Sequence, residues 1–153
     1  SEIQLTSRCV MTDDCIQAGF SLIELMVALS IAAIIAAFAV PAYREHTLRA
    51  QLPEMSSGLQ LSALRLEQYY QDHRSYRNGT ECGITLPSSD RFLFSCSVPE
   101  DGQSFLLTTT GRGGMESFAY TIDHQGQTRT TSLPVAWGEA PLECWVMKRG
   151  AIC

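Results

Sequence analysis

One acidic side chain, Glu24, stands inside an apolar run that carries no other charge between residues 20 and 40. Near the middle of a lone membrane span a carboxylate costs about 2.5–3.5 kcal/mol on insertion scales, so Glu24 requires a cationic partner. If the chain is cleaved after Gly19, the new α-amine of Phe20 is a cation one helical turn from Glu24. The same amine on a neighbouring copy could neutralise the carboxylate. The pattern therefore predicts an apolar helix that packs with copies of itself.

The cysteines are the second group with possible chemistry. Two of the six, Cys9 and Cys15, precede residue 20, and the remaining four are Cys82, Cys96, Cys144 and Cys153. An even set in a domain carried across a membrane favours two disulfides. Pairing neighbours along the chain is the simplest choice, and closing the first loop would contribute about 3 kcal/mol, but three connectivities are possible. There is no C-x-x-C pair, so we expect no metal site.

Catalytic groups are not gathered into a recognisable pattern. The three histidines, His46, His73 and His124, are dispersed along the chain, and we interpret them as surface or capping residues. A Cys/His nucleophile would need a reduced thiol, which the expected disulfides disfavour. The run Gly111-Arg112-Gly113-Gly114 has no P-loop spacing and indicates a flexible loop. We therefore expect neither an enzyme nor a cofactor.

The charge balance argues against a protein built to coat nucleic acid. The formal net charge is −5, and removal of residues 1–19 would leave 10 basic and 13 acidic residues, or −3. Four basic residues could still converge near the carboxyl end and contact phosphates: Arg112, Arg129, Lys148 and Arg149. The simpler interpretation, which we favour, is that these charges are solvated, so DNA is a possible partner but not the expected one.

The element that positions Glu24 is the apolar run itself. A helix over residues 20–40 is about 31 Å long, which matches the hydrocarbon thickness of a bilayer. Small and large apolar residues alternate in this run, which favours close helix packing. The segment before Gly19 is polar, whereas a secretory signal places its apolar core before the cleavage site, so the apolar part is expected to stay with the mature protein.

These residues resemble a known signature. Gly19, the run Phe20-Ser21-Leu22-Ile23-Glu24-Leu25-Met26, the Ala/Ile-rich tail and Pro41-Ala42-Tyr43 are similar to the prepilin cleavage and methylation motif of type IV pilins. The resemblance implies that a prepilin peptidase removes residues 1–19 and that Phe20 is N-methylated. It also implies that Glu24 pairs with a neighbouring N-terminus during assembly. The leader departs from the usual basic pattern at Asp13-Asp14, and Met11 is an alternative start.

The apolar stripe continues beyond the span. Apolar residues recur at steps of three and four from Leu48 to Tyr70, which predicts that the helix passes Pro41 and ends within residues 72–76. Short β-type runs follow at 91–98, 104–110, 118–123, 127–131 and 142–147. One long helix followed by a meander of strands predicts an α+β fold, with the helix on one face of an antiparallel sheet. The expected organisation is a leader (1–19), a span (20–40) and a globular head (41–153).

The resemblance extends weakly into the head. Tyr69-Tyr70, the spacing of Cys82 and Cys96, residues 120–123 and Cys144-Trp145 are most similar to minor pilins. The function implied is a minor structural subunit, held in the inner membrane before assembly with other pilins and then displayed in a surface pilus. The alternatives are a DNA-binding receptor pilin for natural transformation and a pseudopilin of a type II secretion system. Pseudopilins often carry a calcium site where a pilin has its terminal disulfide, and the Cys144 and Cys153 pair counts against that alternative.

Overall fold

The computed structural model describes residues 21–153. Its longest element is α1 (Leu22–His73), a helix of 52 residues that continues through Pro41 and Pro53. The helix ends inside the predicted window of residues 72–76. The chain forms two compact units, Ser1–Pro41 and Ala42–Cys153.

The described part of the first unit is the apolar half of α1. Its best 18-residue window has a mean hydropathy of 2.5, and none of that window is buried. By length and composition this helix can cross a membrane. Glu24 lies in its first turn, where the positive end of the helix dipole favours an acidic side chain.

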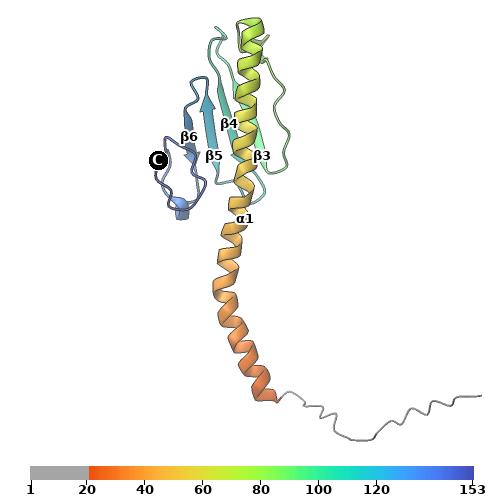
Figure 1. Cartoon of the computed structure of the whole chain (residues 1–153), viewed down its shortest axis with the longest axis vertical. Coiled ribbons are helices and arrows are strands. Elements are labelled where there is room, and N and C mark those ends of the chain that lie inside the picture. The colour runs from red at the N-terminus through yellow and green to blue at the C-terminus, as the bar shows by residue number, and fades with distance from the viewer. Residues whose placement is uncertain (1–20) are drawn as a thin grey trace, which may run out of the picture. The chain divides into compact units, whose positions relative to one another are not determined.

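The second unit is an α+β head, as predicted. Four strands form an antiparallel sheet in the order β3-β4-β5-β6, and Figure 1 shows the upper part of α1 along it. The strands are β3 (Phe92–Ser97), β4 (Leu106–Gly111), β5 (Ala119–Asp123) and β6 (Thr128–Ser132). These four were predicted to within two residues at each end, because short β-type runs bounded by turn residues mark them in the sequence.

A small hairpin and a 3-10 turn complete the head. The hairpin pairs β1 (Arg77–Asn78) with β2 (Glu81–Cys82), and η1 (Val135–Trp137) follows β6. The dipeptide Asn78-Gly79, which is typical of turns, lies at the hairpin turn. Gly79 there has φ 64°, which suits the first central position of a II′ turn.

The strand predicted over residues 142–147 is wrong. Only Leu142 forms a β-bridge there, with Thr130 of β6. Beyond that bridge, side-chain hydrogen bonds replace backbone pairing. The Thr130 hydroxyl donates to the Cys144 carbonyl at 2.6 Å and accepts from the Val146 amide at 3.0 Å. The Tyr120 hydroxyl then donates to the Val146 carbonyl at 2.8 Å. Side-chain bonds thus hold this segment beside β6 without a fifth strand.

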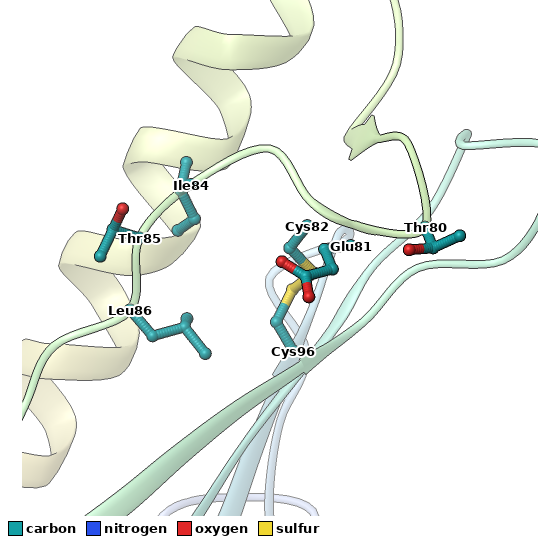
Figure 2. Close-up of a pocket in the computed structure, with 7 residues that line it drawn as sticks. All are labelled: Thr80, Glu81, Cys82, Ile84, Thr85, Leu86 and Cys96. Carbon is teal, nitrogen blue, oxygen red and sulfur yellow. A yellow bond between two sulfur atoms is a disulfide. The ribbon is translucent and has the colours of Figure 1, made fainter.

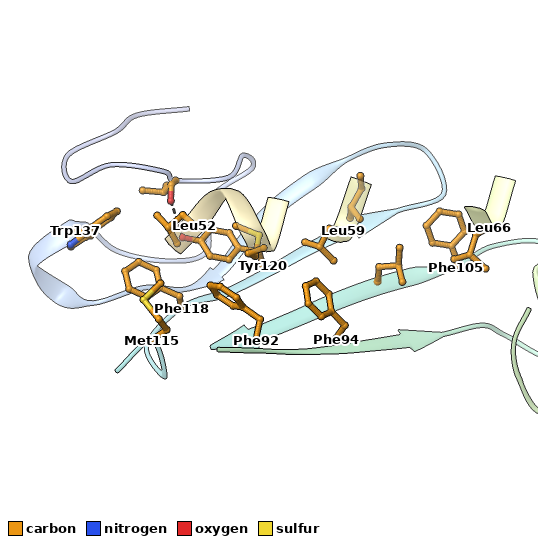
Figure 3. Packing of buried hydrophobic residues seen from close by; sticks show 14 of the residues in the cluster. Leu52, Leu59, Leu66, Phe92, Phe94, Phe105, Met115, Phe118, Tyr120 and Trp137 are labelled. Carbon is orange, nitrogen blue, oxygen red and sulfur yellow. Dashed lines mark hydrogen bonds between the residues drawn. The ribbon is translucent and has the colours of Figure 1, made fainter. Parts of the chain in front are cut away.

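The core lies between α1 and the sheet. Figure 3 shows Leu52 and Leu59 of the helix on the same side as Phe92 and Phe94 of β3, and Leu66 beside Phe105, all buried. These helix positions belong to the stripe that the sequence predicts. Burial of each such side chain contributes about 1.5–3 kcal/mol, so the stripe and the sheet face are the main source of stability in the head.

Candidate functional site

Glu24 lies on a fully exposed apolar helix. All side chains of residues 21–44 are exposed, with Leu22 at 76% and Ile34 at 62%. Within residues 21–153 Glu24 has no ion pair. Gly19 and Phe20, the predicted cleavage and methylation residues, lie outside the described residues. The described helix therefore presents one carboxylate and a long apolar surface, a combination suited to packing against other apolar helices.

The four cysteines of the head form two disulfides between neighbours along the chain. Cys82 is bonded to Cys96, with their Cα atoms 6.2 Å apart, and this bond ties β2 to β3. Cys144 is bonded to Cys153, with their Cα atoms 5.6 Å apart, and this bond closes the carboxyl-terminal loop. The thiols are thus committed to crosslinks, and none of the four is a nucleophile in this state.

An open pocket of about 480 Å³ lies beside the Cys82–Cys96 disulfide. Figure 2 shows that Glu81 and Thr80 line it together with the aliphatic side chains Ile84 and Leu86. Within residues 21–153 no hydrogen bond joins the Glu81 carboxylate to the hydroxyl of Thr80 or Thr85, so no base is placed to activate a nucleophile there. The pocket is therefore interpreted as a surface hollow beside the loop that the Cys82–Cys96 disulfide holds in place.

The three histidines stay apart from one another in the head. His46 is exposed on α1, and His73 stacks on Tyr69 with ring centroids 3.9 Å apart. The His124 ring lies edge-on to the Phe105 ring, with their centroids 6.4 Å apart. No group of three or more His, Cys, Asp or Glu side chains in residues 21–153 is placed to hold a metal ion.

The four basic residues proposed for DNA contact differ in their surroundings. Arg112 follows β4, and its backbone amide donates to the Arg91 carbonyl at 2.7 Å. Arg129, on β6, is paired with Glu143 at 2.8 Å. Lys148 adjoins Arg149, whose Nε donates to the Ala136 carbonyl at 2.8 Å. Arg149 therefore lies beside η1, and Glu143 balances the charge of Arg129.

One polar link between α1 and the loop before β3 was missed by the sequence analysis. The Ser89 hydroxyl donates to Glu54 at 2.6 Å, and Arg91 donates to the same carboxylate at 3.1 Å. The bond from Ser89, with a further contribution from Arg91, holds the pKa of Glu54 below its usual value. Glu54 and Ser89 are 35 residues apart, and no local sequence signal connects them.

A second polar link lies at the carboxyl-terminal end of α1. The Tyr76 hydroxyl donates to Glu67 at 2.8 Å, and Tyr76 stacks on Tyr70 with centroids 4.5 Å apart. Burial, followed by the hydrogen bond to Glu67, raises the pKa of Tyr76 to about 12. This group stays protonated at physiological pH, so it acts as a structural hydrogen-bond donor.

Comparison with known proteins explains the N-terminal pattern. Residues 16–40 match the family model described as the prokaryotic N-terminal methylation motif. A type IV major pilin protein, PilE1, of Neisseria gonorrhoeae is 40% identical over 76 residues, which are 49% of this chain and 46% of that protein. The chain thus spans about half the length of the major pilins that it matches. A type IV pilin structure from Shewanella oneidensis is 22% identical, covers 49% of this chain and 82% of its own, and has a TM-score of 0.43.

One relative matches along most of both chains. The fimbrial protein EcpC of Eikenella corrodens is 30% identical over 132 residues, which are 84% of this chain and 82% of that protein. The methylation motif and the apolar helix also fit a membrane-anchored precursor and a pilus at the cell surface. Because the match to the Eikenella corrodens protein runs through the helix and the sheet as well as the motif, this chain belongs to the type IV pilin family.

Proposed function

We propose that the chain is a minor structural subunit of a type IV pilus, assembled with other pilins through its apolar helix. The observation that carries the proposal is the complete exposure of residues 21–44, which include the window of mean hydropathy 2.5. A helix of this kind needs apolar surroundings, which the membrane supplies before assembly and neighbouring helices supply in a filament. The role is structural and requires no catalytic group.

Glu24 is the proposed recruitment residue. A prepilin peptidase would cleave after Gly19 and expose the amine of Phe20, which is then N-methylated. The amine of a neighbouring subunit can neutralise Glu24, and this removes the cost that an unpaired carboxylate imposes in the membrane. Pairing therefore favours the filament over the membrane-resident precursor.

The minor role is supported by the head. Its resemblance to minor pilins rests on Tyr69-Tyr70, the spacing of Cys82 and Cys96, and Cys144-Trp145, whereas the alignment with the gonococcal major pilin covers 49% of the chain. The Cys144–Cys153 disulfide also favours a pilus subunit over a type II secretion pseudopilin.

The test is mass spectrometry of filaments sheared from the native host. We expect this chain in the filament fraction at a small fraction of the most abundant pilin. Its N-terminal peptide should begin at a methylated Phe20. Full absence from filaments, or retention of residues 1–19 in them, would refute the subunit role. Dominant abundance would instead identify a major subunit.

A further inference from the structure

Two aliphatic side chains at the carboxyl-terminal end of the head are almost fully exposed. Val135, in η1, and Ile152 are each 93% exposed, more than any other large apolar side chain in the described residues. The Gly150 amide donates to the Trp137 carbonyl at 3.3 Å, and each of the two side chains lies two residues from this bond. The bond therefore brings the segments that carry Val135 and Ile152 together.

Basic side chains accompany this apolar pair. Lys148 and Arg149 lie on the same segment as Ile152, and the hydrogen bond from Arg149 to Ala136 fixes that guanidinium beside η1. Neither basic residue has an ion pair in residues 21–153. We define the C-terminal patch by its four exposed members: Val135, Lys148, Arg149 and Ile152.

The C-terminal patch lies at the end of the head that holds Leu52. Figure 3 shows Trp137 at the same end of the core as Leu52, whereas Phe105 lies at the other end with Leu66. Trp137 is 5% exposed and packs edge-on against Phe118 at 5.1 Å, so it anchors η1 to the core. In sequence, Leu52 is closer than Leu66 to the apolar segment of residues 21–41.

The start of the head helix carries matching residues. Tyr43 is 70% exposed, and Arg44 beside it has no ion pair in the described part of the chain. Tyrosine directly after a span is typical of the membrane–water interface, and an arginine side chain there is long enough to reach it. Two exposed carboxylates, Glu116 and Glu139, lie on loops at this end of the sheet, so the basic character is moderate.

We infer that the C-terminal patch docks the head onto the anionic lipid surface of the membrane that holds the precursor. Val135 and Ile152 enter the headgroup boundary, and Lys148 and Arg149 contact lipid phosphates. This inference goes beyond the proposed filament role, because it concerns the state before assembly and needs only membrane attachment. Docking would hold the head at the bilayer until a growing filament takes up the subunit.

The same basic residues could contact DNA, but the patch fits lipid better. A phosphate backbone would leave Val135 and Ile152 in water, whereas a bilayer removes both from water. Arg129, another residue of the possible DNA site, is paired with Glu143. Exposed apolar side chains flanked by basic side chains are typical of a surface that binds the membrane interface rather than of a groove that binds nucleic acid.

The test uses the full chain in nanodiscs, one copy per disc, with brominated acyl chains that quench a tryptophan lying close to them. The two tryptophans, Trp137 and Trp145, are both in the head and report its approach to the bilayer. We expect quenching in phosphatidylglycerol discs and weaker quenching in phosphatidylcholine discs or at high salt. Removing two apolar tips, in Val135→Ser/Ile152→Ser, should lower the docking equilibrium constant by roughly tenfold or more.

The matched control is Leu93→Ser/Leu106→Ser, which removes two aliphatic side chains that are 46% and 44% exposed on β3 and β4. This control should quench as the unmodified chain does. The inference is overturned if the unmodified chain is not quenched, or if Val135→Ser/Ile152→Ser leaves quenching unchanged. Quenching only with two copies per disc would assign the patch to a second copy. Salt-sensitive binding of duplex DNA without quenching would assign it to nucleic acid.

Discussion

Gly58 allows the helix and the sheet to approach closely. A Cβ at this position would lie 2.5 Å from Cζ and 2.7 Å from Cε1 of Phe94, whose ring is buried in the core. Such distances are too short for carbon atoms in contact. The glycine therefore costs helix propensity but permits the packing of Phe94 against α1.

We predict that Gly58→Ala destabilises the head. Alanine gains about 1 kcal/mol of helix propensity, but overpacking a core contact typically costs about 1–3 kcal/mol, so the net effect should be a loss of up to about 2 kcal/mol. Urea unfolding of the full chain in detergent measures the difference. Ser57→Ala, at the neighbouring exposed position, is the control and should change stability by only a few tenths of a kcal/mol. A Gly58→Ala variant more stable than the parent would mean that Phe94 moves aside freely.

Glu54 makes a pH-dependent contribution. Its pKa is lowered in the folded state, so its stabilising effect is present above the unfolded pKa and is lost as the pH falls through the folded value. Because the side chain is 40% exposed, we expect Glu54→Gln to cost at most about 1 kcal/mol at pH 7. The cost should disappear in acid, below the lowered pKa. Unfolding midpoints at both pH values measure it, and an equal cost at both would exclude the charge as its origin.

The residues that the sequence alone singles out are those with local signals. Glu24 is conspicuous because it interrupts an apolar run, and the motif around it needs no tertiary contact. Glu54 with Ser89, and Gly58 with Phe94, are contacts over 35 and 36 positions, and nothing in the chain near either member indicates the other. Chemistry built from distant partners therefore required the folded structure.

At the scale of elements, the long helix and the four-stranded sheet were predictable because their periods are local. Apolar residues at steps of three and four marked the helix face, and Gly-containing turns separated the strands. Residues 142–147 have the composition of a strand but lie beside β6 through Thr130 and Tyr120 side-chain bonds. Composition cannot distinguish a strand from an extended segment held by side chains. The strands β1 and β2, with two residues each, were not predicted either.

The Cys82–Cys96 disulfide holds the hairpin and the loop after it against β3. In the chain-entropy model a loop of this length contributes about 3 kcal/mol, which corresponds to a fall in melting temperature of roughly 10 °C in Cys82→Ser/Cys96→Ser. Thermal unfolding of the full chain in detergent checks this value. Cys144→Ser/Cys153→Ser, which opens a shorter loop, should show a smaller fall. Equal melting temperatures for the first variant and the parent would contradict a stabilising role.

At the scale of the whole molecule, the two units need different surroundings. The head buries its own core, whereas the helix from residue 21 to residue 44 is exposed throughout. A polymer of such chains can bury the apolar helices against one another, and Glu24 then requires a neighbouring cation. This is the central claim of the assembly model, and it depends on one carboxylate.

The most direct test is the recovery of Glu24→Ala in sheared filaments from the native host, measured against its level in the membrane. We predict that the variant is cleaved after Gly19 and stays in the membrane, but enters filaments poorly, because its carboxylate no longer attracts a neighbour's N-terminal amine. Glu100→Ala, an exposed acid in the β3–β4 turn, is the control and should enter normally. Recovery of Glu24→Ala at the level of the unmodified chain would contradict the account.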